Sequence, residues 1–160
     1  MDTPKFRNLM RQQAGAVTII AVGKAGHRTG LTATAMCSLT DNPPMVLICV
    51  NRNASAHAPI RAARCFSVNI LARDQQELAK RFSSKKLEGE ARFDAEAWET
   101  LTTGAPLLKG TIASLDCELA GEQEVETHSI FIGWVKNGRF SEDAAPLVYF
   151  RGGFFDVKKV

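Results

Sequence analysis

The stretch from Gly30 to Leu39, GLTATAMCSL, decides the fold. Side chains of a β-strand alternate between its two faces. If the stretch is one strand, one face carries Thr32, Thr34, Met36 and Ser38, three of which have hydroxyl groups. The opposite face carries small and apolar side chains, namely Leu31, Ala33, Ala35, Cys37 and Leu39. The pattern predicts a strand with a row of hydroxyls on one side and an apolar surface on the other.

The flanking sequence predicts further strands. Asp41-Asn42-Pro43-Pro44 is a strong turn, and Met45–Val50 (MVLICV) after it is a continuous apolar run, typical of a strand buried on both faces. β-branched or alternating apolar residues predict the other strands, at Ala16–Val22, Cys65–Leu71, Thr111–Leu119, Ser129–Val135 and Leu147–Phe150. Asn137-Gly138 is a turn signal.

Three short helices are expected between these strands. Their ranges are 6–13, 55–63 and 74–82, and Ser55 is the expected N-cap of the second. The polar segment from Ser83 to Gly104 is interpreted as an excursion with at least one short helix. Most consecutive strands are joined by loops too short for a βαβ crossover, so the sequence favours an antiparallel barrel over a parallel sheet.

Composition limits the classes of protein to consider. The chain has 160 residues, which suits one domain over residues 1–160, with 45% apolar and 23% charged residues. A net charge of +3, from 20 basic and 17 acidic residues, does not by itself indicate nucleic-acid binding. The N-terminal residues lack the apolar region of a signal peptide, and no apolar run is long enough to span a membrane. The cytoplasm is therefore the default location.

The four cysteines do not form a metal-binding or redox motif. No pair has CxxC spacing, and no cluster with histidine resembles a zinc site. All four stand among apolar or small neighbours, so we expect free, buried thiols in a reducing compartment. They are Cys37, Cys49, Cys65 and Cys117.

Two segments could bind a ligand. The hydroxyls of Thr32, Thr34 and Ser38 form a row suited to a polar ring edge or a phosphate, but a solvent-facing polar strand gives the same pattern. The segment from Asn51 to Ser55 combines an arginine with the start of a helix, which suits an anion. An ordinary capped turn explains that segment equally well.

Two later segments are candidates of the same kind. His128 stands at the start of an apolar strand, where it could orient a nicotinamide or relay a proton, or be a histidine without a role. Tyr149 and Arg151 lie in the final segment LVYFRGG, at 147–153. An aromatic ring can stack on a flavin or adenine, and an arginine can pair with phosphate, although an edge strand with a solvated arginine fits as well.

These segments occur in an order that spans nearly the whole chain, and together they resemble the short flavin reductases of the split-barrel family. The family includes reductase components of two-component flavin monooxygenases, such as 4-hydroxyphenylacetate 3-monooxygenase. The matching motifs are GLTATA at 30–35, CSLTD at 37–41, CVNR at 49–52, FSVNIL at 66–71, HSIFIG at 128–133 and PLVYFRG at 146–152.

The resemblance implies a six-stranded antiparallel Greek-key split barrel with a few peripheral helices, and a set of site residues. Along the isoalloxazine and ribityl chain it implies Thr32, Ala33, Thr34 and Ser38. For the ribityl phosphate or the adenosine half it implies Asn51, Arg52 and Ser55, with Phe82 and Ser83 closing over the phosphate. Near the nicotinamide it implies His128 as the catalytic position, with Tyr149 and Arg151 approaching the same cleft. Many relatives have serine where this chain has Ala35.

The implied activity is hydride transfer from NADH, or NADPH, to FMN or FAD, in a homodimer that supplies reduced flavin to a partner monooxygenase. No metal, nucleic acid or membrane is implied. Two alternatives stay open: a non-enzymatic flavin electron carrier with the same barrel, and a barrel that binds another ligand, such as a heme or a pyridoxal-type phosphate. The sequence leaves FMN against FAD, NADH against NADPH, and tightly bound against diffusing flavin undecided.

Overall fold

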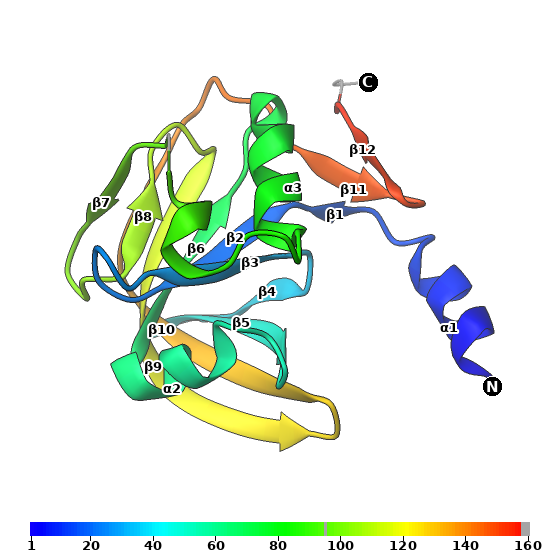
Figure 1. Cartoon of the computed structure of the whole chain (residues 1–160), viewed down its shortest axis with the longest axis horizontal. Coiled ribbons are helices and arrows are strands. Elements are labelled where there is room, and N and C mark those ends of the chain that lie inside the picture. The colour runs from blue at the N-terminus through cyan, green and yellow to red at the C-terminus, as the bar shows by residue number, and fades with distance from the viewer. Residues whose placement is uncertain (95, 158–160) are drawn as a thin grey trace.

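The computed structural model describes residues 1–94 and 96–157, and it is built mainly of antiparallel β-strands (Figure 1). A seven-stranded sheet has the order β3-β2-β6-β9-β10-β5-β4, and every neighbouring pair in it is antiparallel. Its strands are β2 (Thr18–Val22), β3 (Thr29–Ala33), β4 (Met36–Asp41), β5 (Pro44–Asn51), β6 (Cys65–Ile70), β9 (Ala113–Val125) and β10 (His128–Phe140).

Two small sheets and a few helices surround this sheet. One small sheet joins β1 (Gly15–Ala16), β11 (Val148–Phe150) and β12 (Gly153–Phe155), and the other joins β7 (Trp98–Thr100) and β8 (Pro106–Leu108). The α-helices are α1 (Thr3–Met10), α2 (His57–Ala63) and α3 (Gln76–Ser83), and 3-10 turns cover Arg73–Gln75 and Gly89–Arg92. The last turn lies inside the predicted excursion, as expected. The prediction of an antiparallel, mainly β chain is confirmed.

The six-stranded barrel is not confirmed, because among the described residues the main sheet has seven strands and is not closed. The reason lies in the stretch that decides the fold. Gly30–Leu39 is not one strand: it breaks at Thr34 and Ala35 into β3 and β4, which form the two opposite edges of the sheet. The chain therefore turns from one edge to the other without a hydrogen-bonded pair between them.

The break also exchanges the two faces. Leu31 and Ala33 of β3 pack against the core, and on β4 it is Met36 that does so. Odd-numbered side chains thus point inward before the break and even-numbered ones after it. The predicted continuous hydroxyl face is wrong, because Ser38 follows the face of Met36 whereas Thr32 lies on the opposite one.

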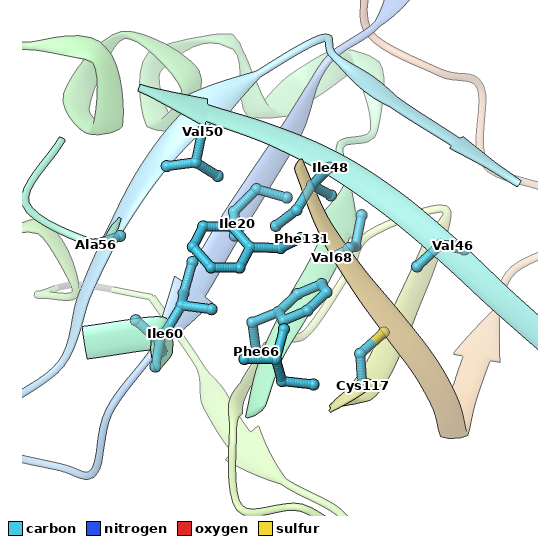
Figure 2. Close-up of a cluster of buried hydrophobic side chains, with 12 residues drawn as sticks. Ile20, Val46, Ile48, Val50, Ala56, Ile60, Phe66, Val68, Cys117 and Phe131 are labelled. Carbon is cyan, nitrogen blue, oxygen red and sulfur yellow. The ribbon is translucent and has the colours of Figure 1, made fainter. Parts of the chain in front are cut away.

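The core consists of two clusters, and β2 separates them. All five residues of β2 are buried, with Ile20 in the first cluster and Ile19 in the second. Figure 2 shows the first cluster, where Phe66 and Phe131 lie among aliphatic side chains of β5. Burial of one such side chain contributes roughly 1.5–3 kcal/mol. These clusters hold in place the strands that carry the site.

Helix α1 begins three residues earlier than predicted. Asp2 accepts a hydrogen bond from the backbone N–H of Lys5 at 2.8 Å, and Pro4 lies in the first turn. No side chain of α1 is buried, and the helix stands away from the main sheet (Figure 1). Its predicted apolar face therefore has no partner within the described part of the chain.

Two local predictions are also wrong. Ser55 does not cap α2, whose N-cap is Ala56; the Ser55 hydroxyl instead accepts a hydrogen bond from Thr29 Oγ1 at 3.1 Å. Asn137-Gly138 is not a turn, because β10 continues through these two residues to Phe140. A register shift against β9 lies directly before them. Tertiary pairing with β9 overrides the local preference there.

The cysteines are free, as predicted, but only Cys117 is buried, and that burial raises the pKa of its thiol to about 12. Cys37 is exposed and the other two are half-buried, so the expectation of four buried thiols is wrong. In residues 1–94 and 96–157, no helix has the length and apolar character required to cross a membrane.

Candidate functional site

The candidate site lies between β3 and residues 49–55, the end of β5 and the segment that follows it. The backbone N–H of Cys49 donates to the carbonyl of Ala35 at 3.0 Å, and Thr29 contacts Ser55 at the other end of β3. Residues 49–55 thus run along the free edge of β3, held to it at both ends. This arrangement places the predicted Thr32–Thr34 and Asn51–Ser55 segments on the two sides of one split in the fold.

A cleft of about 250 Å³ opens on the side of the split nearest α3. Thr32, Ala33 and Thr34 form one wall, and Ser83 at the end of α3 and Tyr149 on β11 complete it. The Thr32 hydroxyl donates to the carbonyl of Ala79 at 2.7 Å, so it offers a ligand only its lone pairs. Thr34 is exposed and makes no side-chain hydrogen bond within residues 1–94 and 96–157. Its hydroxyl and that of Tyr149 are donors that the cleft offers.

Thr34 also borders two neighbouring cavities. One, of about 350 Å³, lies between α1 and the outer side of β4 and β5, where Cys37, Leu47 and Cys49 line it. The other, of about 250 Å³, lies between α1 and β11. Gly15 permits this crowding, because a Cβ there would come within 3.3 Å of Thr34 Cβ. The break between β3 and β4 is therefore the meeting point of all three cavities.

The hairpin of β11 and β12 brings Tyr149 and Arg151 to these cavities. Arg151 and Gly152 both have positive φ angles, +48° and +88°, as a tight two-residue hairpin turn requires. The Arg151 side chain donates from Nε to Gln12 Oε1 at 2.8 Å, which fixes it next to the end of α1. The Tyr149 ring packs edge-on against Phe154, at 5.5 Å between ring centroids.

A second group of predicted residues gathers where β5 ends and β10 begins. Asn51 and His128 are register partners, and the backbone N–H of Arg52 donates to the carbonyl of Thr127 at 3.0 Å. His128 is exposed, and its Nδ1 lies 2.8 Å from the Thr127 hydroxyl. Nε2 makes no hydrogen bond within the described residues, so this nitrogen is available to a ligand.

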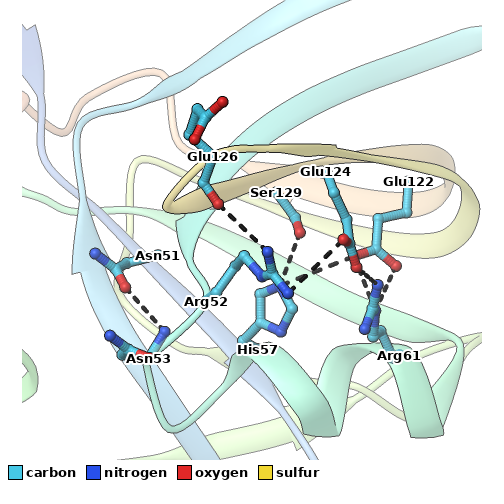
Figure 3. A network of polar contacts seen from close by, with 9 residues as sticks. All are labelled: Asn51, Arg52, Asn53, His57, Arg61, Glu122, Glu124, Glu126 and Ser129. Atoms are coloured by element: carbon cyan, nitrogen blue, oxygen red, sulfur yellow. Dashed lines mark hydrogen bonds and ion pairs between the residues drawn. The ribbon is translucent and has the colours of Figure 1, made fainter.

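An ionic network lies beneath this second group (Figure 3). Buried His57 is hydrogen-bonded through Nε2 to Ser129 Oγ at 2.8 Å, and the same nitrogen lies 3.8 Å from Glu122 Oε1. Arg61 on α2 pairs with Glu122 at 2.6 Å and with Glu124 at 2.5 Å. Burial is the largest single influence and raises the pKa of Glu122, but the hydrogen bonds from Arg61 and Ser129 and the charges of Arg61 and His57 together outweigh it, so the pKa lies below its usual value.

Three predicted site residues lie apart from both groups. Ser38 is exposed on β4 and lines none of the three cavities, because the face exchange turns it away from Thr34. The Phe82 side chain is 1% exposed and packs against Phe93 and Trp98, so its ring lines none of the three cavities. Ser55 stays at the split, with its hydroxyl bound to Thr29. No group of three or more metal-ligating side chains occurs in residues 1–94 and 96–157.

Comparison with known proteins agrees with this geometry. The sequence model of the flavin reductase like domain matches residues 10–158. The chain belongs to the flavin reductase family. It is 38% identical over 159 residues to the FMN reductase (NADH) RutF of Serratia proteamaculans, covering 99% of this chain and 90% of the relative. It is 33% identical over 155 residues to the 4-hydroxyphenylacetate 3-monooxygenase reductase component of Salmonella typhimurium, covering 96% and 91%.

Solved structures give the same family. The NADH:FAD oxidoreductase SgcE6 of Streptomyces globisporus, in complex with NAD and FAD fragments, superposes with a TM-score of 0.90 at 28% identity, covering 98% of this chain and 93% of SgcE6.

Sequence reasoning about this flavin reductase missed the network of His57, Arg61 and Glu122. A signal was present, because Glu122 and Glu124 alternate as they do on one strand face, and an alternating acidic pair needs a cationic partner. The partner, Arg61, lies 61 residues away from Glu122 along the chain, and only the fold reveals it.

Proposed function

We propose that the protein transfers hydride from NADH to FMN or FAD at the cleft beside Thr34. The observation that carries the proposal is the meeting of Thr34, Ser83 and Tyr149 around one cleft in a chain that belongs to the flavin reductase family. The three residues come from different parts of the sequence, so no local motif accounts for their convergence.

The residues of the cleft fit a flavin. Val17, Ala33 and Phe154 supply apolar surface for the ring system, and the free hydroxyl of Thr34 supplies a donor for a ring carbonyl. Ser83 donates to the carbonyl of Lys80 at 2.9 Å and keeps its lone pairs. When bound, a flavin accepts the hydride at N5; the chain binds and orients the two rings.

His128 is the proposed contact for the nicotinamide. Thr127 holds its Nδ1, and Nε2 is left free, so the ring presents one fixed nitrogen. The network of His57 and Glu122 stabilises the strand ends on which His128 and Asn51 lie, through the hydrogen bond of His57 to Ser129, the neighbour of His128.

We further propose that the working unit is a homodimer. The outer side of β4, β5 and β10 is apolar, although the exposed face of an antiparallel sheet is usually polar. Its half-exposed or exposed side chains, paired across the strands, are Cys37, Met45, Leu47, Cys49, Ile130, Ile132 and Trp134. Phe6, Leu9 and Met10 of α1 are 54%, 52% and 47% exposed beside it. A second copy would cover both surfaces, and the 350 Å³ cavity between them would then lie at the interface.

Two experiments test these proposals. NADH and NADPH oxidation is measured with FMN, FAD and riboflavin in turn; steady oxidation of NADH by added flavin supports the reductase, and no turnover with any of them would leave the alternative of a non-enzymatic flavin carrier.

Sedimentation of the wild type and of Leu47→Glu tests the dimer. We expect the wild type to sediment as a dimer and the variant as a monomer.

The fate of the reduced flavin is a separate proposal. The relative from Salmonella typhimurium is the reductase component of a two-component monooxygenase. We propose by analogy that this protein releases reduced flavin to a flavin-dependent monooxygenase. A monooxygenase that turns over only when this protein and NADH are present would support that role.

A further inference from the structure

The cavity between α1 and β11 contains three arginines. Arg7 and Arg11 come from α1, and Arg151 from the turn between β11 and β12. The cavity measures about 250 Å³, and it shares Thr34 and Tyr149 with the proposed flavin cleft. Arg7 and Arg11 are four residues apart, so they lie on the same side of the helix.

Among the described residues, none of the three guanidinium groups has an acidic partner. In residues 1–94 and 96–157 the ion pairs involve other basic residues, namely Arg28, Arg52, His57, Arg61, Arg73, Lys80, Arg81, Lys109, Lys136 and Arg139. No Asp or Glu is among the described residues that line the cavity. Three like charges around a small cavity repel one another, and an anion bound between them would remove that repulsion.

Arg151 is held in place. Its backbone N–H donates to the carbonyl of Arg11 at 3.1 Å, and its side chain donates to Gln12. Its φ of +48° is unfavourable for a residue with a side chain, and glycine or asparagine would suit that turn position better. Arg151 is exposed, and these two hydrogen bonds tie it to the residues that follow α1, which holds its charge beside Arg7 and Arg11.

We propose that this cavity binds the diphosphate of a dinucleotide that reacts at the neighbouring cleft beside Thr34. The guanidinium group matches phosphate oxygens through paired hydrogen bonds, and several of them are needed for the two charges of a diphosphate. Tyr149 lies between the two cavities, where an aromatic ring can pack against the linker or a base. The inference rests on the proposed reductase function, and two dinucleotides, NADH and FAD, carry this group.

The test compares Arg7→Gln/Arg11→Gln with Lys5→Gln in the full-length protein. Lys5 lies on the same exposed helix but outside the cavity, so its substitution controls for the loss of charge. With riboflavin as acceptor, which carries no phosphate, NADH is the only source of a diphosphate. If NADH supplies the diphosphate, the KM for NADH rises on the order of tenfold in the double variant, about 1.4 kcal/mol, and stays unchanged in Lys5→Gln.

A second arm distinguishes the two sources. At saturating NADH, the KM values for FAD and riboflavin are compared in each variant. A rise for FAD alone assigns the cavity to FAD, and a rise for NADH alone assigns it to NADH; either supports the proposal. Equal changes for riboflavin, FAD and NADH, or no change in any of them, overturn it.

Binding of inorganic pyrophosphate tests the diphosphate site independently of the proposed reductase function. Calorimetry measures its binding to the wild type and both variants without any turnover. We expect binding to the wild type and Lys5→Gln and at least tenfold weaker binding to Arg7→Gln/Arg11→Gln, or about 1.4 kcal/mol. Equal affinity in all three proteins would overturn the diphosphate site even if NADH reduces flavin. Absence of NADH oxidation together with the expected pyrophosphate result would overturn only the reductase.

Discussion

Around Thr34 some polar side chains at the cavities have no partner among the described residues, whereas around His57 the polar side chains bind one another (Figure 3). Thr34, Arg7 and Arg11 have no side-chain partner among the described residues. Glu122, by contrast, is shared by Arg61 and His57. Both regions carry charge and both lie near predicted site residues, so the charge alone does not distinguish them. What distinguishes them is whether the hydrogen-bonding capacity is already used within the chain.

The difference indicates a division of roles. A polar group without a partner next to a cavity is available to a ligand, and a group saturated within the fold stabilises the element that carries it. Substitutions around Thr34 should therefore change ligand affinity and leave stability unaltered. Substitutions in the network of His57, Arg61 and Glu122 should lower stability first.

The largest expected effect is at His128, which belongs to the network region by position and to the site by its free Nε2. His128→Ala should lower kcat/KM for NADH by on the order of 100-fold, because the nicotinamide loses its positioning contact. Flavin affinity, measured by fluorescence titration, should change far less. Unchanged NADH kinetics would remove His128 from the site and place it with the supporting residues.

His57→Ala is expected to act through stability. The side chain is 5% exposed, it is hydrogen-bonded to Ser129, and its ring packs against Phe131 at 5.1 Å between centroids. Its loss should lower the free energy of unfolding by about 2–3 kcal/mol, as other deletions from cores do. Urea denaturation measures this, with exposed His27→Ala as the control. A wild-type unfolding midpoint would show that the network does not support the fold.

Thr34→Val should have a smaller effect, and the effect should be on flavin affinity instead of on stability. It keeps the shape of the side chain and removes the donor, so flavin affinity should fall by about 1 kcal/mol with no change in unfolding. Thr34→Ser retains the hydroxyl and is the matched control, with near wild-type affinity. If both variants bind flavin as the wild type does, the Thr34 hydroxyl is not a flavin contact.

Much of the fold could be predicted from local patterns, because antiparallel strands reveal themselves by apolar alternation. The strands 18–22, 44–51 and 65–70 lie close to the predicted ranges, and α3 ends one residue later than expected. The break at Thr34–Ala35 could not be predicted in this way. Both halves have the composition of a strand, and only the need to reach two opposite edges of the sheet separates them.

The site was predictable in part for a related reason. Residues such as Tyr149 and Arg151 stand in a recognisable order along the chain, which the family resemblance detects, although each signal is weak alone. Arg7 and Arg11 have no such signal, because exposed arginines on a short helix are ordinary. Their significance comes from the position of the end of α1 beside the turn between β11 and β12, which places them at one cavity with Arg151.

The smallest expected effect is on the pH dependence of the free energy of unfolding. Because the folded-state pKa of Glu122 lies below the usual 4.5, its ionised form contributes stability above that pH, and the contribution is lost as the pH falls through the folded-state value. Glu122→Gln should therefore lower the free energy of unfolding at pH 7 by at most about 1 kcal/mol, the range of exposed ion pairs. The difference from wild type should narrow below pH 4.5, and thermal unfolding at a series of pH values measures it. A difference independent of pH would mean that Glu122 acts through packing, and the contrast between a saturated charge network and an open ligand cleft would then rest on His57 alone.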